Sequence, residues 1–264
     1  MDPELCRTLN HMSLEQLANY LHVDLKIIEQ YYQELLEDDA FLNEINQQIH
    51  HARKFYQKGI CKHEKLDSVD WMAIQRIIIY ILVRMFKPKI CLETGVFYGG
   101  NTCFILNALR RNEQGKLISI DLPANDIDSE LRHHLVGDTE DIAMGLDIGF
   151  IVHENLKKRW KLIRGDSHKE IPNIDEEIDF YLHDSEHSFN FIKKEMSLVW
   201  EKLSKNAIII ADDLDWSNGF FGFCVEKKIY PLIITDNGKS GLKARTGIVK
   251  LGHSAEKEKD IVGE

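Results

Sequence analysis

Acidic residues and one histidine follow two strongly apolar segments in the second half of the chain. The first cluster is HDSEH at 183–187, and the second is the pair Asp212 and Asp213. Carboxylates that converge repel one another unless a cation neutralises them or some are protonated. An all-oxygen set made of Asp184, Asp212 and Asp213 therefore predicts a site for a hard ion such as Mg²⁺. The alternative is that Asp184 and only one of the pair face a cleft, without a metal.

His187 is the candidate proton acceptor of this cluster. It lies three residues after Asp184, so the two side chains share a face if a helical turn begins there. A neutral imidazole can take a proton from a hydroxyl group, and a cation bound to that hydroxyl would lower its pKa. A structural role for His187 is the alternative. His183 is a weaker candidate, because strand alternation turns it away from Asp184.

A turn that contains glycines joins an apolar segment to a helical one at 92–102, LETGVFYGGNT. Glycines let the backbone pass close to a ligand, and the following helix N-terminus offers free N–H donors. The spacing E-x-G-x-x-x-G, from Glu93 to Gly99, departs from the G-x-G-x-x-G of dinucleotide-binding proteins. A carboxylate here would repel a pyrophosphate and suits a cationic amine or sulfonium, which disfavours a nicotinamide oxidoreductase. A purely structural turn is the alternative.

Two further apolar segments also end in an acid. Lys116–Asp121 ends in a carboxylate that can accept hydrogen bonds from both hydroxyls of a ribose. Lys161–Gly165 is followed by Asp166 and Ser167, a polar tip able to contact an adenine edge. Each acid alone fits a helix cap or a solvated loop equally well. Four strand ends that each carry an acid favour a shared binding edge.

The elements that must position these residues alternate along the chain from residue 68 onward. Unbroken apolar strands between helices indicate a parallel sheet covered on both faces, in which ligands bind beyond the carboxyl ends of the strands. The predicted fold is α/β, a Rossmann-like, doubly wound and mostly parallel seven-stranded sheet with an N-terminal helical extension. The expected strands are 89–94, 116–121, 161–165, 178–183, 207–211, 230–235 and 246–251, and the helices among them are 69–85, 101–111 and 189–203.

The first 65 residues are predicted to be helical. Ser13 and Gln16 match a capping box, and further helices are expected over about 25–36 and 40–56. Such a segment buries little core alone, so we expect a helical cap or oligomerisation arm at 1–65 and a second domain at 66–264. Ser68 is the expected cap of the helix that Pro88 prevents from continuing.

Residues from about 68 to 251 resemble class I S-adenosylmethionine-dependent methyltransferases. More narrowly, they resemble the family that holds macrolide-sugar O-methyltransferases and cephalosporin-hydroxylase-like proteins. The segments that carry this likeness are ETGVFYGGNT (93–102), LISID (117–121), LIRGDS (162–167), FYLHDSEHSF (180–189) and IIIADD (208–213).

The resemblance implies a role for each of these segments. S-adenosylmethionine would contact the turn through its methionine part, Asp121 through its ribose, and Asp166 and Ser167 through its adenine. A divalent metal would bind at Asp184, Asp212 and Asp213, and His187 would act as the base, so that His187 and Asp184 are the catalytic residues. The turn residues implied as cofactor contacts are Glu93, Thr94, Gly95, Gly99, Asn101 and Thr102.

Two loops are candidate acceptor-binding elements. The segment 214–221 holds Trp216, Phe220 and Phe221, which could stack on a sugar or a planar acceptor. Entry of the two phenylalanines into the core as part of a helix is equally compatible with the sequence. The insertion 122–160 is long enough for a lid, and Gly145, Gly149 and residues 150–152 fit a mobile gate.

Composition excludes several other classes of protein. The chain has 264 residues and a formal net charge of −10, which disfavours nucleic-acid binding. Five scattered cysteines without a CxxC pair disfavour a disulfide framework, and Cys61 with His63 fits a surface loop better than a zinc site. We expect no signal peptide, because residues 1–10 have neither a basic n-region nor an apolar h-region. No membrane span is expected either, because the apolar stretch 77–86 contains Arg84 and is short. A cytoplasmic protein follows as the expectation.

The leading hypothesis is a Mg²⁺-dependent O-methyltransferase acting on a hydroxyl of a glycoside or another small metabolite, as in natural-product biosynthesis. A metal-independent small-molecule methyltransferase is the nearest alternative. The other is a non-catalytic subunit that binds S-adenosylmethionine, which would need neither a metal site nor a base. The expected partner is a small hydroxylated acceptor, and a homo-oligomer is expected.

Overall fold

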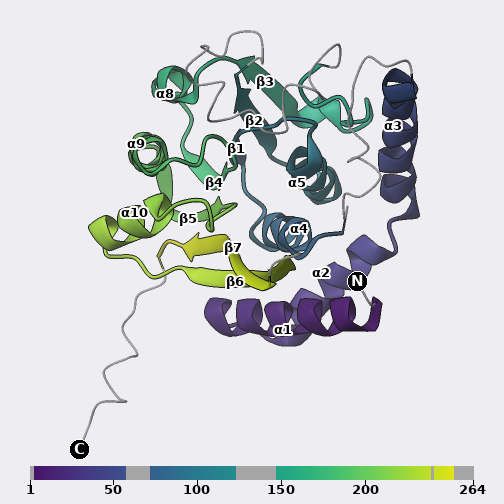
Figure 1. Ribbon diagram of the computed structural model, residues 1–264, viewed down its shortest axis with the longest axis horizontal. Coiled ribbons are helices and arrows are strands. Elements are labelled where there is room, and N and C mark those ends of the chain that lie inside the picture. Colours follow the sequence, from purple (N-terminus) through teal and green to yellow (C-terminus); the bar gives the residue numbers. More distant parts are fainter. Residues whose placement is uncertain (1–2, 58–71, 123–146, 239–240, 253–264) are drawn as a thin grey trace, which may run out of the picture.

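The computed structural model describes residues 3–57, 72–122, 147–238 and 241–252 (Figure 1). Seven strands form one sheet in the order β3-β2-β1-β4-β5-β7-β6. The strands from β3 to β5 run parallel, whereas β7 pairs antiparallel with β5 and with β6. The predicted seven-stranded, mostly parallel sheet is therefore confirmed. The strands are β1 Ile90–Thr94, β2 Lys116–Asp121, β3 Trp160–Arg164, β4 Ile178–His183, β5 Leu203–Ala211, β6 Leu232–Gly238 and β7 Gly241–Lys250.

Helices cover both faces of this sheet, because its strands are apolar on both sides. In β4, Phe180 and Leu182 join the core beneath α4 and α5, while Tyr181 faces the opposite core beneath α9 and α10. The described helices are α1 Pro3–Leu21, α2 Leu25–Leu36, α3 Asp39–Gln57, α4 Ile74–Phe86, α5 Gly100–Asn112, α8 Ser167–Glu170, α9 Phe189–Trp200 and α10 Gly219–Lys227, with 3₁₀ turns η3 Lys157–Arg159 and η4 Ile171–Asn173.

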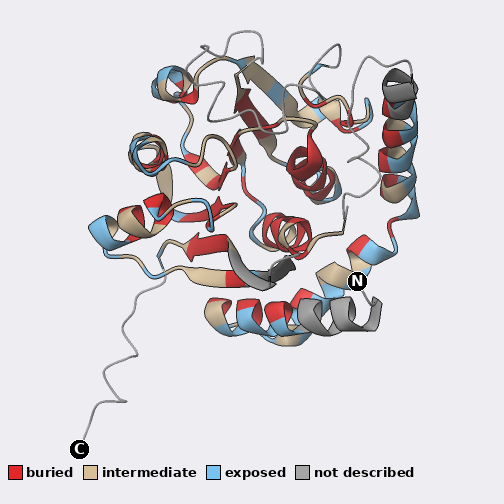
Figure 2. Cartoon of the chain, in the orientation of Figure 1, coloured by how far each residue is buried: buried red, intermediate tan, exposed pale blue. Residues whose placement is uncertain are grey.

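Helices α1–α3 pack on the outside of α4 and α5 through one buried face (Figure 2). Phe41 of α3 meets Phe104 of α5 edge-on, with ring centroids 5.1 Å apart. Polar contacts surround this apolar interface: the Arg84 Nε atom lies 2.6 Å from Glu34 Oε1, and Arg111 Nε lies 2.9 Å from Asp38 Oδ2. The expected boundary between 1–65 and 66–264 falls among residues that the structure does not describe, so that division stays a prediction.

Two expected helix starts are wrong. Ser13 is not a cap, because α1 begins at Pro3 and Ser13 lies buried inside it; proline is well tolerated at a helix start since its missing N–H would be unpaired there anyway. The helix expected from Val69 begins at Ile74 instead, because Ala73 is extended and makes no side-chain cap. Residues Ile77–Val83 are completely buried, so packing rather than capping stabilises α4.

The described loops settle one further expectation. Phe220 lies in α10 and is completely buried, as in the core alternative, whereas Trp216 is 68% exposed. Of the insertion, 123–146 with Gly145 lies outside the described residues, as do Cys61, His63 and Ser68. Its described end packs on the glycine turn, with Gly149 donating to the Phe97 carbonyl over 2.8 Å. Among the described helices, none is long and apolar enough to cross a membrane.

Candidate functional site

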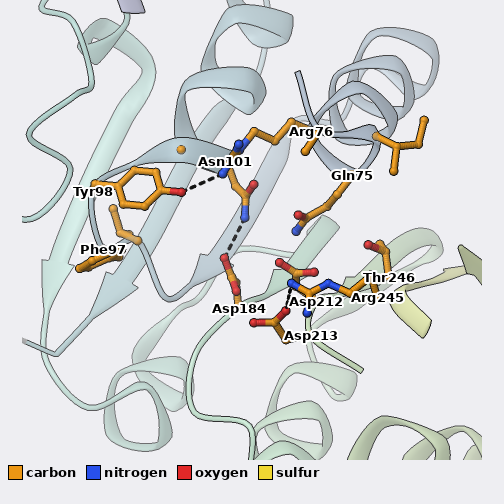
Figure 3. Close-up of a pocket in the computed structure, with 14 residues that line it drawn as sticks. Gln75, Arg76, Phe97, Tyr98, Asn101, Asp184, Asp212, Asp213, Arg245 and Thr246 are labelled. Atoms are coloured by element: carbon orange, nitrogen blue, oxygen red, sulfur yellow. Dashed lines mark hydrogen bonds and ion pairs between the residues drawn. The ribbon is translucent and has the colours of Figure 1, made fainter. Parts of the chain in front are cut away.

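A cavity of about 360 Å³ opens at the carboxyl edge of the sheet, where β1, β4 and β5 end (Figure 3). The glycine turn forms one wall of this cavity, and the segment that leads into α4 forms another. The antiparallel strand β7 contributes Arg245 and Thr246 to a third wall. The lining side chains that carry polar or charged groups are Gln75, Arg76, Tyr98, Asn101, Asp184, Asp212, Asp213, Arg245 and Thr246.

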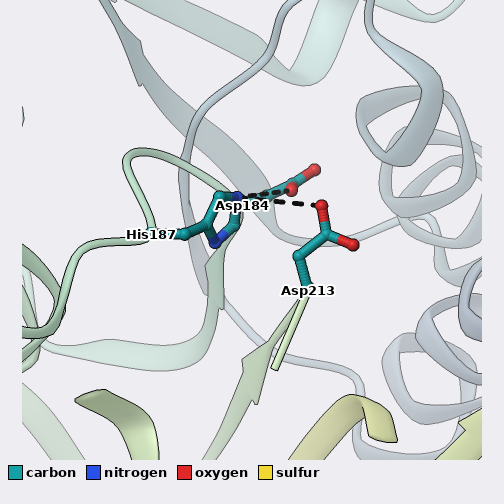
Figure 4. A group of neighbouring side chains, drawn as sticks. All are labelled: Asp184, His187 and Asp213. Carbon is teal, nitrogen blue, oxygen red and sulfur yellow. Dashed lines mark ion pairs between the residues drawn. The ribbon is translucent and has the colours of Figure 1, made fainter. Parts of the chain in front are cut away.

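Asp184, His187 and Asp213 converge at one side of the cavity (Figure 4). The His187 Nε2 atom lies 4.0 Å from Asp184 Oδ1 and 3.9 Å from Asp213 Oδ2. One oxygen of each carboxylate is held from behind: Asn101 Nδ2 donates to Asp184 Oδ2 over 2.8 Å, and Arg245 pairs with Asp213 Oδ1. The remaining two oxygens and the imidazole nitrogen therefore face a common point.

The charge state of His187 matters for any role in this group. Burial lowers the pKa of His187 to about 4, and the neighbouring His183 adds to the effect. The imidazole is therefore neutral at pH 7, with a lone pair free to bind a metal or to accept a proton. Its other nitrogen, Nδ1, is buried without a hydrogen-bond partner.

Asp212 lies in the same cavity but outside this group. Figure 3 shows its carboxylate pointing toward Gln75. Burial and the charge of Asp213 raise the pKa of Asp212 to about 7, and burial with the charges of Asp212 and Asp213 also raises the pKa of Asp184. Of the three carboxylates expected to share one ion, Asp184 and Asp213 converge with His187, while Asp212 lines the same cavity and its charge acts on Asp184. Asp213 adopts a left-handed φ of 49°, which is uncommon for a residue other than glycine.

The glycines of the turn lie against other segments of the chain, at positions where a larger residue would clash. A Cβ atom on Gly95 would lie 1.9 Å from the Asp184 carbonyl oxygen, and one on Gly99 would lie 2.6 Å from a Val152 methyl group. The amides of Val96 and Phe97 both donate to Asp121 Oδ2, over 3.0 and 2.7 Å. Asp121 therefore clamps the turn, and burial raises its pKa. The absence of a side chain at Gly95 lets the Asp184 backbone lie against the turn, a contact that the sequence did not indicate.

Three predicted cofactor contacts lie beneath the turn instead of along the cavity. Glu93 is completely buried and accepts hydrogen bonds from Thr102 Oγ1 at 2.9 Å and from Ser119 Oγ at 2.6 Å. Burial raises the pKa of Glu93 to about 8, so its carboxyl group is mostly protonated at neutral pH. Thr94 is also buried and donates to Glu195 over 2.7 Å. These side chains support the turn from below.

The two residues expected at the adenine follow β3. Asp166 caps α8 by accepting from the His168 amide over 2.9 Å, and it pairs with Lys169 at 3.5 Å. Ser167 is buried and donates a short hydrogen bond to Glu195. Both residues lie at the carboxyl edge, but neither lines the cavity.

Several polar residues of the site were not singled out from the sequence. Arg76 is a charged residue in the otherwise apolar run IQRIIIYILV, and Glu195 occupies the buried face of α9 with Ile192, Met196 and Val199. A charge on an apolar helical face is a signal that the sequence carries. Arg245 and Thr246 lie in β7, and no local pattern points to the cavity for them.

Comparison with known proteins agrees with this geometry. Residues 92–214 match a family described as a methyltransferase domain. No curated protein sequence matches the chain. The chain covers nearly the whole length of the solved structures that resemble it, and identities below 20% mean that these structures show a shared fold.

Three of these solved structures are compared here with the chain. A protein from Klebsiella pneumoniae has a TM-score of 0.54 at 15% identity over 86% of this chain and 96% of its own. The O-methyltransferase from Bacillus cereus, solved with SAH, has a TM-score of 0.53 at 19% identity over 84% and 96%. The O-methyltransferase TomG from Streptomyces achromogenes, which takes part in tomaymycin synthesis and was solved with SAM, has a TM-score of 0.50 at 17% identity over 84% and 95%.

Proposed function

We propose that this chain, whose residues 92–214 match a methyltransferase domain, uses S-adenosylmethionine to methylate a hydroxyl group of a small acceptor with the help of a divalent cation. One observation carries the proposal. The side chains of Asp184, His187 and Asp213 converge at the edge of a cavity that the glycine turn also lines. A methyl donor held at the turn and a hydroxyl held at this group would lie side by side, which is what in-line transfer requires.

For the cofactor, the proposal assigns S-adenosylmethionine to the exposed part of the turn and to the strand-end residues around it. Asp121 would bind the ribose hydroxyls while its Oδ2 atom keeps the turn closed through Val96 and Phe97. Asp166 and Ser167 would lie at the adenine, and the turn from Gly95 to Asn101 would contact the methionine part. When bound, the sulfonium group supplies an activated methyl group, so the chain has to orient and dehydrate the reactants more than to activate the donor.

The group formed by Asp184, His187 and Asp213 fits a divalent cation. Two carboxylate oxygens and one neutral imidazole nitrogen are ordinary metal ligands, and each carboxylate is oriented from behind by Asn101 or Arg245. The raised pKa of Asp184 marks a repulsion between acids that a cation would relieve. When bound, such a cation would lower the pKa of an acceptor hydroxyl.

His187 can serve this site in one of two ways, because its Nε2 atom has a single lone pair. With Mg²⁺ on the carboxylates alone, as the sequence predicts, Nε2 accepts the proton of the acceptor hydroxyl. With Nε2 as a ligand, the mixed nitrogen and oxygen set suits Mn²⁺ or Zn²⁺ better than Mg²⁺. The preferred ion therefore reports on the role of His187.

The unsatisfied groups of the cavity favour a hydroxylated acceptor such as a sugar. The Asn101 Oδ1 and Thr246 Oγ1 atoms are buried without hydrogen-bond partners. Such atoms are costly unless a ligand or water pairs with them. Trp216 is exposed with its ring 5.9 Å from that of His187, and it offers a face on which a sugar could stack. No nucleic-acid or membrane partner is proposed, and the homo-oligomer and the cytoplasmic location stay predictions.

Transfer of a labelled methyl group from S-adenosylmethionine tests the proposal. The protein is stripped with EDTA, assayed against a panel of polyhydroxylated acceptors, and assayed again after addition of Mg²⁺, Mn²⁺ or Zn²⁺. We expect turnover that is lost with EDTA and restored by one of these ions. Turnover that EDTA leaves intact would support the metal-independent enzyme. Tight binding of S-adenosylmethionine without turnover of any acceptor would support the non-catalytic subunit.

A further inference from the structure

A single buried carboxylate, that of Glu195, organises a hydrogen-bond network behind the cavity. Glu195 lies on α9 and has no exposed surface. Its oxygens accept from Thr94 Oγ1 at 2.7 Å, Tyr181 OH at 2.7 Å, His183 Nδ1 at 2.6 Å and Ser185 Oγ at 3.0 Å, and from Ser167 Oγ at short range. No residue of this network lines the cavity.

The donors of this network come from different parts of the carboxyl edge. Thr94 ends β1, Ser167 follows β3, and Ser185 follows β4 one residue after Asp184. His183 also lies against the site, because its ring centroid is 5.6 Å from that of His187. Glu195 therefore contacts the segment that carries Asp184 and His187 from two sides.

We propose that Glu195 is a positioning residue that holds the segment 184–188 through Ser185 and His183, so that Asp184 and His187 face Asp213. The inference rests on the proposed function of that group. Among the described residues, Asn101 donates a side-chain hydrogen bond to Asp184, and the segment after Asp184 contains no regular helix or strand until α9 begins at Phe189. Its order must therefore come from contacts such as those of Ser185.

The cost of burying Glu195 supports a specific role. A buried carboxylate is expensive unless it is fully paired, and an apolar residue would pack on this face of α9 without that cost. Burial alone would raise the pKa of Glu195, but His183 and the surrounding hydroxyl donors hold it at about 2. The carboxylate is thus always charged at neutral pH and always able to bind all of its donors.

Variants that each lack one hydroxyl group can distinguish an effect on the position of the segment 184–188 from an effect on the stability of the whole fold. Ser185→Ala removes the hydroxyl that links Glu195 directly to the segment 184–188 and leaves His183 in place. Tyr181→Phe removes a hydroxyl that donates to the same carboxylate from inside β4, and it serves as the matched control. The readouts are hydrogen–deuterium exchange of the peptide 183–190, the affinity for Mn²⁺ alone, the affinity for S-adenosylhomocysteine by calorimetry, and the thermal midpoint.

We expect Ser185→Ala to increase the hydrogen-exchange rate of this peptide about tenfold and to weaken Mn²⁺ binding about tenfold. A tenfold change corresponds to the free energy of about one hydrogen bond to a charged group. Its affinity for S-adenosylhomocysteine should not change, and Ser185→Thr should restore the wild-type values. Tyr181→Phe should lower the thermal midpoint and leave all three site readouts unchanged.

Two results would overturn the inference. One is an exchange rate in Ser185→Ala equal to that of the wild type, and the other is an equal loss of site order in Tyr181→Phe. Both can be read from hydrogen exchange even if wild-type protein binds no Mn²⁺ and transfers no methyl group. A failure of the proposed function is thereby kept distinct from a failure of the positioning role.

Discussion

The buried carboxylate of Glu195 and the carboxylates that line the cavity both lie at the carboxyl edge of the sheet, and their oxygens are satisfied to different degrees. Glu195 accepts hydrogen bonds from five side chains, and its pKa is lowered to about 2. In the cavity, Asp212 has its pKa raised to about 7, and Asn101 Oδ1 and Thr246 Oγ1 have no partner.

This difference separates a structural network from a binding site. A buried acid whose donors are all supplied by the protein has no capacity left for a ligand, and it fixes the groups around it. A cluster with raised pKa values and unpaired polar atoms is stabilised when a ligand or a cation arrives. We call the hydrogen-bond network of Glu195 the closed network, and the group of Asp184, His187 and Asp213 the open cluster. The closed network would thus hold the open cluster in place.

The largest expected effect on methyl transfer comes from a substitution at Gly95, where the glycine turn contacts the backbone of Asp184. Gly95→Ala would place a Cβ atom 1.9 Å from the Asp184 carbonyl oxygen, so that Asp184 must move. We expect methyl transfer to fall by about a hundredfold or more, since a misplacement of about 1 Å can cost that much. Labelled methyl transfer measures this loss.

Gly252→Ala is the control for Gly95→Ala, because Gly252 also has a positive φ, of 75°, but its Cβ would meet the flexible end of Asn206. It should cost about 1–2 kcal/mol of stability from the left-handed backbone alone and leave turnover unchanged. Equal turnover in the two variants would contradict the role given to Gly95.

Removal of one charge from the open cluster should have the next largest effect. Asp213→Asn keeps the shape of the side chain but weakens any cation site, so we expect turnover to fall by about a hundredfold. Affinity for S-adenosylhomocysteine, measured by calorimetry, should remain that of the wild type. Asp215→Asn is the matched control, since Asp215 also contacts Arg245, at 3.0 Å, and lies outside the converging group. Lost cofactor binding in Asp213→Asn would contradict this separation of roles.

Substitution of two asparagines on α5 should have smaller effects, one on metal binding and the other on stability. Asn101 orients Asp184, so Asn101→Ala should weaken Mn²⁺ binding by roughly tenfold. Asn107 instead donates to Asp38 over 3.0 Å, and Asn107→Ala should lower stability by about 1–3 kcal/mol without a change in Mn²⁺ affinity. Calorimetric titration and denaturant unfolding of both variants separate these outcomes, and the reverse pattern would contradict the assignment.

The smallest expected effect is a difference in the pH dependence of stability, measured by unfolding in EDTA. The pKa of Asp212 is raised from 3.8 to about 7, so its contribution should destabilise the fold as pH rises through that range, and Asp212→Asn should remove this trend. The pKa of Glu195 is lowered from 4.5 to about 2, so its contribution is present above 4.5 and lost as pH falls toward 2. Glu195→Gln should lack this acid-side loss, and identical profiles for the two variants would contradict the comparison.

Much of the fold could be predicted from the sequence because its signals are local. β2 and β4 have the expected bounds, 116–121 and 178–183, since apolar runs that end in an acid mark both ends clearly. The predicted starts of α1 and α4 were wrong because buried packing stabilises these helices more than the local capping signals do, as the buried position of Ser13 inside α1 shows.

The candidate site could be predicted only in part. Asp184, His187 and Asp213 were identified, because each follows an apolar strand closely and parallel strands end at one edge. The grouping of His187 with Asp184 and Asp213 rather than with Asp212 is a property of the folded chain, and so are the hydrogen bonds that buried Glu93 accepts from Thr102 and Ser119. Neither has a sequence pattern of its own.

By itself, the sequence determined the order of strands and helices and the acids at their ends, because alternation of apolar residues and strand-end position are properties of short segments. Only the tertiary structure decided which donors meet which acids. Arg245 reaches Asp213 from an antiparallel strand, and Glu195 reaches Ser185 from a helix on the far face of the sheet. Such contacts arise from segments that pack side by side, and they divide the acids into one closed network and one open site.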